Sequence, residues 1–313
     1  MRVRPSTWRP VVLLVEKLKQ VKLPGFDGLS VYDIALFFFQ GLNNASVDIR
    51  ASSLAFRFFM AIFPSLIFLF TLIPYIPISG FQQQLLLLLG EILPKSVFSE
   101  AESAIVNLIS QRQGGLLSFG FFFTLYLTTN GMRAMINSFN ETSHFQEKRN
   151  QITIWLISLV LVFILFLLLA FGISLIVFGN FLWIWMAKQG IISAGLLSVA
   201  LVTGKWVSLL TVFFVGLSLI YYLGPGERSP LRFTSAGASF ATLLIIMGSL
   251  GFAFFVNNFG NYNKFYGSLG TIIVVMLWIY FNTLAVLLGY ELNNSLVGLK
   301  GGKLPERKEK QNT

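Results

Sequence analysis

The chain has 313 residues, of which 55% are hydrophobic and only 12% are charged. A soluble domain carries about 25% charged residues and needs a wet surface, so this composition excludes an ordinary soluble protein. Cysteine is absent and His144 is the only histidine, which excludes disulfides, thiolate metal sites and a multi-histidine metal centre. The net charge of +10 is typical of a membrane protein that keeps Lys and Arg beside anionic lipid.

Six stretches of the chain are long and apolar enough to cross a bilayer, which requires about 20 residues. They are residues 51–76, 116–136, 152–178, 196–223, 234–257 and 268–290. We therefore predict an all-α fold, a polytopic bundle of six transmembrane helices in residues 51–292. Residues 1–50 form a cytoplasmic N-terminal segment, and residues 293–313 form a polar cytoplasmic tail.

The distribution of Lys and Arg fixes the orientation. With a cytoplasmic N-terminus the outer segments hold four of them, Lys95, Arg112, Lys188 and Lys264. The inner segments hold seventeen: Arg2, Arg4, Arg9, Lys17, Lys19, Lys22, Arg50, Arg133, Lys148, Arg149, Arg228, Arg232, Lys300, Lys303, Arg307, Lys308 and Lys310. Cytoplasmic loops carry the excess of positive charge, so both termini are predicted to be cytoplasmic and the number of spans to be even.

Three segments are predicted to lie beside the membrane. Residues 31–42 are apolar but too short to cross, and residues 10–21 alternate apolar and charged residues. Each is either an interfacial helix or a tail helix packed on the bundle. The outer loop 77–115 carries leucine and isoleucine at helical spacing, interrupted at Leu93-Pro94. It predicts two amphipathic helices that cap the bundle, with a substrate lid as the less favoured interpretation.

Two cations fall inside predicted spans, and such residues are functional candidates because burying a charge in a bilayer is costly. Arg57 lies about 10 Å from the inner end of the first span. It either snorkels to the cytoplasmic interface or faces a cavity and holds an anionic group. Lys205 precedes Trp206, so it either marks the outer interface or lies within the fourth span.

Other residues of the spans suggest packing roles. Pro64 predicts a kink in the first span. The glycines Gly237, Gly248, Gly251, Gly267 and Gly270 permit close helix contacts. The amides of Asn130, Asn137 and Asn282 are expected to bond between helices. The carboxylates lie outside the spans or at their ends, and His144 is read as a solvated loop residue, so neither a proton relay nor an active site is indicated.

Three motifs resemble the YihY/BrkB family of bacterial inner-membrane proteins. The first runs from Ala51 to Pro64, where Arg57 replaces a more usual aromatic residue, and the second from Asn130 to Arg149. The most specific spans Asn261 to Gly270, followed by Trp278 to Tyr280 and by Leu288-Gly289-Tyr290-Glu291-Leu292-Asn293. The resemblance covers about residues 31–296 and implies six helices, no established catalytic residue and no cofactor.

Family members were once labelled as a tRNA-processing ribonuclease, but this chain lacks the His and carboxylate cluster of a metal-dependent nuclease. Other members have been linked to export of lipid or lipopolysaccharide precursors. We therefore expect a multi-pass inner-membrane transporter or flippase-like exporter of an anionic lipid or amphiphile, with a non-transporting envelope scaffold as the alternative. Its expected partners are membrane lipids and envelope proteins or a second copy of the chain, not nucleic acid. The candidate substrate-binding residues are Arg57, Pro64, Asn137, Lys205, Tyr262, Tyr266, Gly267, Asn282 and Glu291.

Overall fold

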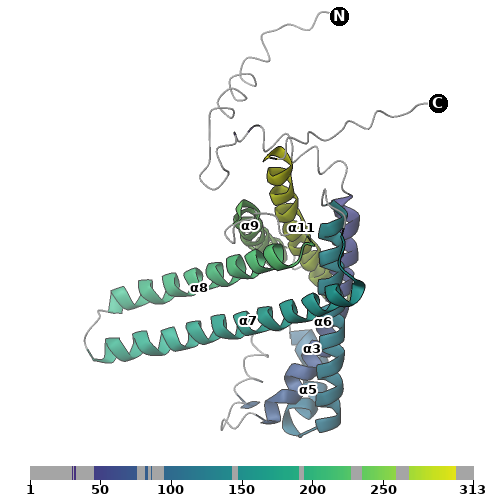
Figure 1. The fold of residues 1–313 in the computed structure, drawn as a ribbon. Coiled ribbons are helices and arrows are strands. Elements are labelled where there is room, and N and C mark those ends of the chain that lie inside the picture. The colour runs from purple at the N-terminus through teal and green to yellow at the C-terminus, as the bar shows by residue number, and fades with distance from the viewer. Residues whose placement is uncertain are drawn as a thin grey trace, which may run out of the picture.

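The computed structural model describes residues 46–75, 95–142, 147–189, 194–226, 235–258 and 268–300, with Ser30, Tyr32, Gln82, Gln83 and Leu86. Its elements are helices, as the sequence predicts (Figure 1). The long helices are α3 (Val47–Leu72), α6 (Gly114–Thr142), α7 (Gln151–Lys188), α8 (Ala194–Leu223), α9 (Ala236–Asn258) and α11 (Ser268–Lys300). The shorter elements are the 3₁₀ turn η2 (Ile73–Tyr75) and α5 (Lys95–Ser110).

Each of the six predicted spans falls on one long helix. Five of the described helices are apolar and long enough to cross a membrane, over Val47–Tyr75, Gln151–Leu175, Leu201–Leu223, Ala236–Phe255 and Ile272–Leu296. Helix α6 is long enough but less apolar, because Thr129, Asn130, Arg133 and Asn137 interrupt its second half. The multi-pass helical class is therefore confirmed, whereas the count of six spans stays a prediction.

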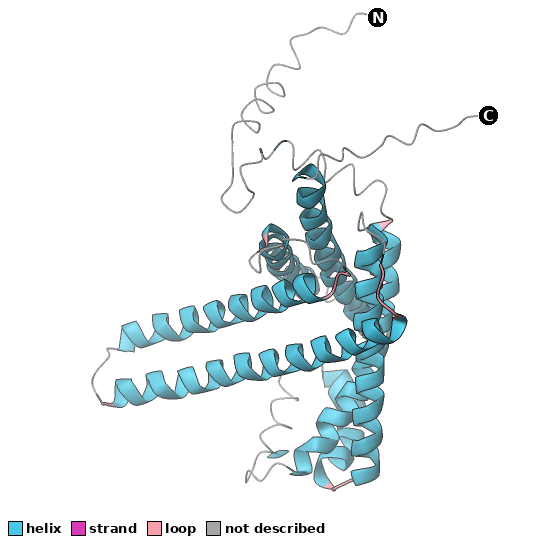
Figure 2. Cartoon of the chain, viewed as in Figure 1, coloured by secondary structure: helices cyan, strands magenta, loops and turns pink. Residues whose placement is uncertain are grey.

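The six long helices contact one another in a closed order. Helix α3 packs between α6 and α11, α9 lies between α11 and α8, and α7 joins α8 back to α6. The α7–α8 hairpin diverges from the α3–α6 pair, so that the two pairs meet near the α6–α7 connection (Figures 1 and 2). Helix α7 has 38 residues, a length of about 57 Å, and therefore extends well beyond a hydrocarbon layer of about 30 Å.

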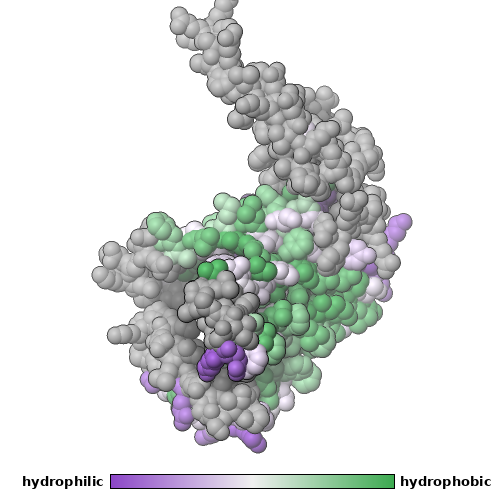
Figure 3. All heavy atoms as spheres, turned by 90° about the vertical axis from the view of Figure 1, so that its left-hand side faces the viewer, coloured by the Kyte–Doolittle hydropathy of each residue, from purple (hydrophilic) through white to green (hydrophobic). Residues whose placement is uncertain are grey.

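The main core gathers at one end of this ring. It combines side chains from all six long helices, among them Leu54 of α3, Phe139 of α6, Ile154 of α7, Tyr221 of α8 and Tyr290 of α11. Away from this end, the apolar side chains of α7 and α8 are largely uncovered, and apolar residues form a broad surface on the described atoms in Figure 3. In the predicted orientation, the packed end is the cytoplasmic one.

The outer loop contains one of the two predicted amphipathic helices. Helix α5 begins directly after Pro94, and its Ile105 and Ile109 are buried against Ile73 of the η2 turn that follows α3. This packing agrees with a capping role. The other expected helix, and the membrane-surface segments 10–21 and 31–42, lie largely outside the described residues.

Two glycines allow α9 and α11 to cross at backbone contact. A Cβ on Gly237 would lie 2.0 Å from the carbonyl oxygen of Gly289, and a Cβ on Gly289 would lie 2.6 Å from that of Gly237. The prediction of close contact is therefore confirmed for Gly237. At Gly248 and Gly251 an added Cβ would meet no atom within 4 Å, so close contact is not made there.

Candidate functional site

The packed end of the bundle is held by a buried ion pair between α3 and α11. The Nη2 of Arg50 donates to Oε1 of Glu291 at 3.0 Å, and the two side chains are only 9% and 5% exposed. The Nη1 of Arg50 donates to the carbonyl oxygen of Ser138 at 2.5 Å, near the C-terminus of α6. A cation is favoured there because the last helical carbonyls carry partial negative charge. Arg50 thus connects three helices.

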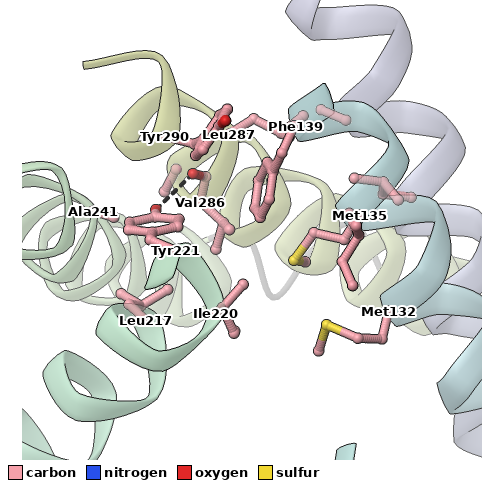
Figure 4. Close-up of a cluster of buried hydrophobic side chains, with 14 of the residues drawn as sticks. Met132, Met135, Phe139, Leu217, Ile220, Tyr221, Ala241, Val286, Leu287 and Tyr290 are labelled. Carbon is pink, nitrogen blue, oxygen red and sulfur yellow. Dashed lines mark hydrogen bonds between the residues drawn. The ribbon is translucent and has the colours of Figure 1, made fainter. Parts of the chain in front are cut away.

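Three aromatic rings, those of Phe139, Tyr221 and Tyr290, form a layer within the main core (Figure 4). The rings of Phe139 and Tyr290 are stacked with centroids 4.2 Å apart, and Tyr221 meets Phe139 edge-on at 5.8 Å. The hydroxyl of Tyr221 donates to the carbonyl oxygen of Val286 at 2.6 Å. Stacked and edge-on pairs add stability beyond their buried area, so this layer fastens α6, α8 and α11 together.

Asn293 joins α11 to the beginning of α9. Its side chain is fully buried; its Oδ1 accepts from the backbone N–H of Gly237 at 2.7 Å, and its Nδ2 donates to Ser235 Oγ at 3.0 Å. The Ser235 Oγ also accepts from the N–H of Ala238 at 3.2 Å, as an N-cap residue does. The N–H groups in the first turn of a helix have no acceptor within their own helix, so Asn293 of α11 supplies an acceptor to the first turn of α9.

A second polar cluster fastens the α6–α7 connection to the turn that ends α8. Arg149 donates from Nε and Nη2 to the Glu147 carboxylate, and from Nη2 to the carbonyl oxygen of Gly224 at 2.8 Å. Asn140 donates to Glu147 at 2.5 Å and accepts from the N–H of Gly226 at 3.1 Å. Hydrogen bonds from Arg149 are the main cause that lowers the pKa of Glu147 below its ordinary value.

We call Arg50, Phe139, Tyr221, Glu291 and Asn293, with the Glu147 cluster, the closed end. All the helix termini that meet there belong to the side that the sequence predicts to be cytoplasmic. Its polar groups bond to one another, so the arrangement holds helices together. The described residues contain no group of three or more His, Cys, Asp or Glu side chains that is placed to hold a metal ion.

Of the predicted site residues that the structure describes, Glu291 alone belongs to the closed end. Arg57 is exposed on α3, Lys205 is exposed on α8, and Pro64 is buried in a helix that continues through it. Tyr262, Tyr266 and Gly267 lie outside the described residues.

The side-chain amides of the two predicted site residues Asn137 and Asn282 take no part in the hydrogen bonds of the closed end. Asn137 is half-buried on α6 and makes no hydrogen bond to a described residue. Asn282 donates to the carbonyl oxygen of Trp278 in its own helix at 2.7 Å. It lines a groove of about 10 Å³ between α9 and α11, which is room for about one water molecule. A bond of the expected kind, from one helix to another, is made instead by Asn293, and Asn140 bonds to the segments that connect helices.

Sequence reasoning missed Arg50, which it counted only as an inner-side charge. Its partner, Glu291, is 241 positions away, and no local sequence pattern predicts an ion pair over that separation. A signal did exist in the sequence from Gly289 to Asn293. In this segment Gly289 permits close contact with α9, and Tyr290 stacks on the ring of Phe139. Glu291 forms the ion pair with Arg50, and Asn293 accepts a hydrogen bond from the first turn of α9.

Together, the apolar helices and the closed end define a multi-pass helical membrane protein. More particularly, the chain belongs to the virulence factor BrkB family, whose family model matches residues 38–313. It is 34% identical over 257 residues to YfkH of Bacillus subtilis, which is named as a ribonuclease-like protein, covering 82% of this chain and 92% of that one.

Shorter matches reach proteins named as membrane proteins of the UPF0761 group. One from Vibrio campbellii is 35% identical over 92 residues, which is 29% of each chain. One from Pseudoalteromonas translucida is 36% identical over 81 residues, 26% of this chain and 27% of the relative. No solved structure matches the chain.

Proposed function

We propose that the protein is an inner-membrane transporter or flippase-like exporter that moves an anionic lipid or amphiphile, with both termini in the cytoplasm. The observation that carries this proposal is the asymmetry of the helix ring. It is fastened by buried polar and aromatic contacts at the closed end, whereas the α7–α8 hairpin diverges from the α3–α6 pair away from that end. A bundle whose helices are fastened at one side and separate toward the other is compatible with one state of an alternating-access carrier.

The uncovered surfaces favour an amphiphile over a small polar solute. Along the diverging α7–α8 hairpin, many large apolar side chains are exposed, including Phe163, Phe166 and Phe171 of α7 and Val202 of α8. An acyl chain matches such a surface. The exposed cations Arg57 and Lys205 favour a negatively charged headgroup.

The test is translocation in proteoliposomes. Fluorescent phosphatidylglycerol is incorporated symmetrically, and a membrane-impermeant quencher bleaches the outer leaflet. We expect the protected half of the signal to decay faster than in protein-free vesicles or in vesicles with an unrelated six-helix protein. Decay no faster than in the empty vesicles, and unchanged by Arg57→Ala, would sink the proposal. A gradient or a partner would supply the driving force, so each is added in turn.

A non-transporting scaffold is the second candidate, and the α7–α8 hairpin favours it. The hairpin diverges from the α3–α6 pair and carries uncovered apolar side chains that an envelope protein would cover as well as lipid does. This function predicts a stoichiometric partner that co-purifies with the chain and is lost when Phe166 and Phe171 are changed to serine. Translocation would then be absent.

We further propose that the chain is not an enzyme, although a relative's name describes it as ribonuclease-like. One histidine and no cysteine leave few residues for nuclease chemistry. Purified protein, freed of contaminating nucleases, is expected to leave tRNA intact over hours. Cleavage that follows the protein through every column would contradict this.

A further inference from the structure

Helix α6 carries an amphiphilic stripe on the face that points away from the core. Its residues are Phe119, Phe123, Tyr126, Asn130, Arg133 and Asn137, spaced alternately by four and three positions, which places them on one helix face. All six are exposed or half-buried, whereas Met132, Met135, Ile136 and Phe139 are buried in the core. The outer half of the stripe is aromatic and the half nearer the closed end is polar.

The polar half of this α6 stripe makes a single side-chain hydrogen bond to the described residues. The amides of Asn130 and Asn137 make no hydrogen bond to any described residue. The guanidinium of Arg133 donates to Gln151 Oε1 at 3.3 Å and forms no ion pair with a described carboxylate. A polar group on a membrane-facing helix surface is costly unless something satisfies it. The stripe therefore requires a polar partner from outside the described chain.

A second cation lies at the same depth on α3. The hydrogen bond from Arg50 to Ser138 fixes the antiparallel register of α3 and α6, as does the packing of Gly131 on Phe58, where an added Cβ would lie 3.0 Å from the ring. Arg57 directly precedes Phe58, and Arg133 follows Gly131 by two positions, so they lie within about one turn of each other along the membrane normal. Arg133 is about 5 Å from residue 136, the predicted inner end of its span. At that depth, lipid headgroups meet acyl chains.

We propose that the α6 stripe binds an anionic phospholipid of the leaflet on the closed-end side, with Arg57 adding charge at the same level. The phosphate is held by the Arg133 guanidinium, and the amides of Asn130 and Asn137 bond to phosphate and glycerol oxygens. An acyl chain runs along Phe123 and Phe119, whose rings are stacked at 5.4 Å. As a loading site this rests on the proposed function, whereas the binding itself does not require transport.

An anionic phospholipid fits this site better than an acidic segment of another protein. The charge at one end of the α6 stripe and the aromatic rings at the other match a molecule with a charged head and a long apolar tail. A bilayer supplies that molecule at high local concentration at this depth, and basic positions on the cytoplasmic side of spans recognise anionic headgroups.

The experiment is photo-crosslinking of the full chain in phosphatidylcholine vesicles. The probe is phosphatidylglycerol with a diazirine on one acyl chain, compared with the same diazirine on phosphatidylcholine. Adducts are mapped by mass spectrometry. We expect the phosphatidylglycerol probe to label α6 between residues 119 and 126 and the phosphatidylcholine probe to label it several-fold less. Arg133→Gln should lower the phosphatidylglycerol adduct on the order of five-fold.

The matched variants separate charge from folding. Arg133→Lys keeps the charge and should retain most of the α6 adduct, whereas Lys188→Gln removes an exposed cation at the far end of α7 and should leave it unchanged. Equal labelling by both probes, or an adduct unchanged by Arg133→Gln, would overturn the site. So would a co-purifying protein that crosslinks to the stripe and is lost with Arg133→Gln. A phosphatidylglycerol-specific adduct without translocation would leave the site standing and remove the proposed function.

Discussion

Arg50 and Glu291 place opposite charges in the contact between α3 and α11, where water is largely excluded. Removal of one partner from a buried ion pair leaves the other charge uncompensated, which costs about 3–5 kcal/mol. We therefore expect Glu291→Gln and Arg50→Met each to lower the thermal midpoint of unfolding in detergent strongly. The measurement is the loss of monodisperse protein on heating, monitored by size-exclusion chromatography.

The combined Arg50→Met, Glu291→Leu variant distinguishes a charge effect from a packing effect. Replacing both partners of a buried pair by apolar residues is often neutral or stabilising, so the double variant should be more stable than either single variant. Arg57→Met is the control, because it removes an exposed cation from the same helix. If the loss of stability in the double variant equalled the sum of the losses in the two single variants, the two charges would not be coupled.

Gly289 is the second residue for which the structure predicts a large effect. A Cβ there would lie 2.5 Å from the Tyr221 hydroxyl oxygen and 2.6 Å from the carbonyl oxygen of Gly237. Since the second neighbour is backbone, the α9–α11 contact must open. We expect Gly289→Ala to cost about 1–3 kcal/mol. Gly251→Ala, which meets no atom within 4 Å, should change stability by less than about 1 kcal/mol in the same heating assay.

At the scale of elements, the Glu147 cluster makes the joint between α6, α7 and α8 sensitive to acid. The pKa of Glu147 lies below its ordinary value of 4.5 in the folded protein. A carboxyl group whose pKa is lower in the folded than in the unfolded chain stabilises the fold at any pH above its unfolded pKa. This stabilisation is lost as the pH falls through the folded pKa. We expect the native chain to unfold at a higher temperature than Glu147→Gln at about pH 7, and the difference to shrink below about pH 4.5.

The unfolding midpoint of both chains is measured from about pH 7 to pH 3, in the range where the carboxyl group titrates. Glu141→Gln is the control, because that carboxyl is exposed at the end of α6. A difference between native and Glu147→Gln protein that stayed constant through acid would show that the bonds to Arg149 and Asn140 act without the negative charge.

The sequence predicts the elements well where hydropathy alone decides them. The six apolar stretches became helices, and Leu93-Pro94 marks where α5 begins. It predicts their ends less well, because apolar counting ignores helix caps. The predicted sixth span ends at residue 290, yet α11 continues to Lys300, and Asn293 within that extension bonds to the start of α9. Such a bond depends on a helix crossing that no local window contains.

At the scale of the whole molecule, the charge count predicts which helix ends share a side, and the closed end agrees with it. The order of helices around the ring was not predictable, because six apolar helices of similar length have few features that choose neighbours. The choice is made by contacts between distant positions, such as Gly237 with Gly289 and Arg50 with Ser138. For the same reason, the candidate site was predicted only at Glu291.

The number of spans depends on α6, the one predicted span that is not apolar enough by composition alone. If α6 crosses the membrane, Glu102 before it and Lys148 after it lie on opposite sides; both are exposed. Because the chain has no cysteine, single substitutions to cysteine report accessibility without background. We expect Glu102→Cys to react with a membrane-impermeant maleimide in intact spheroplasts, and Lys148→Cys to react only after the membrane is permeabilised. The control, Gln189→Cys at the end of α7, should react as Glu102→Cys does. Reaction of Glu102→Cys and Lys148→Cys from the same side would place α6 along the membrane, reduce the spans to five, and put the termini on opposite sides.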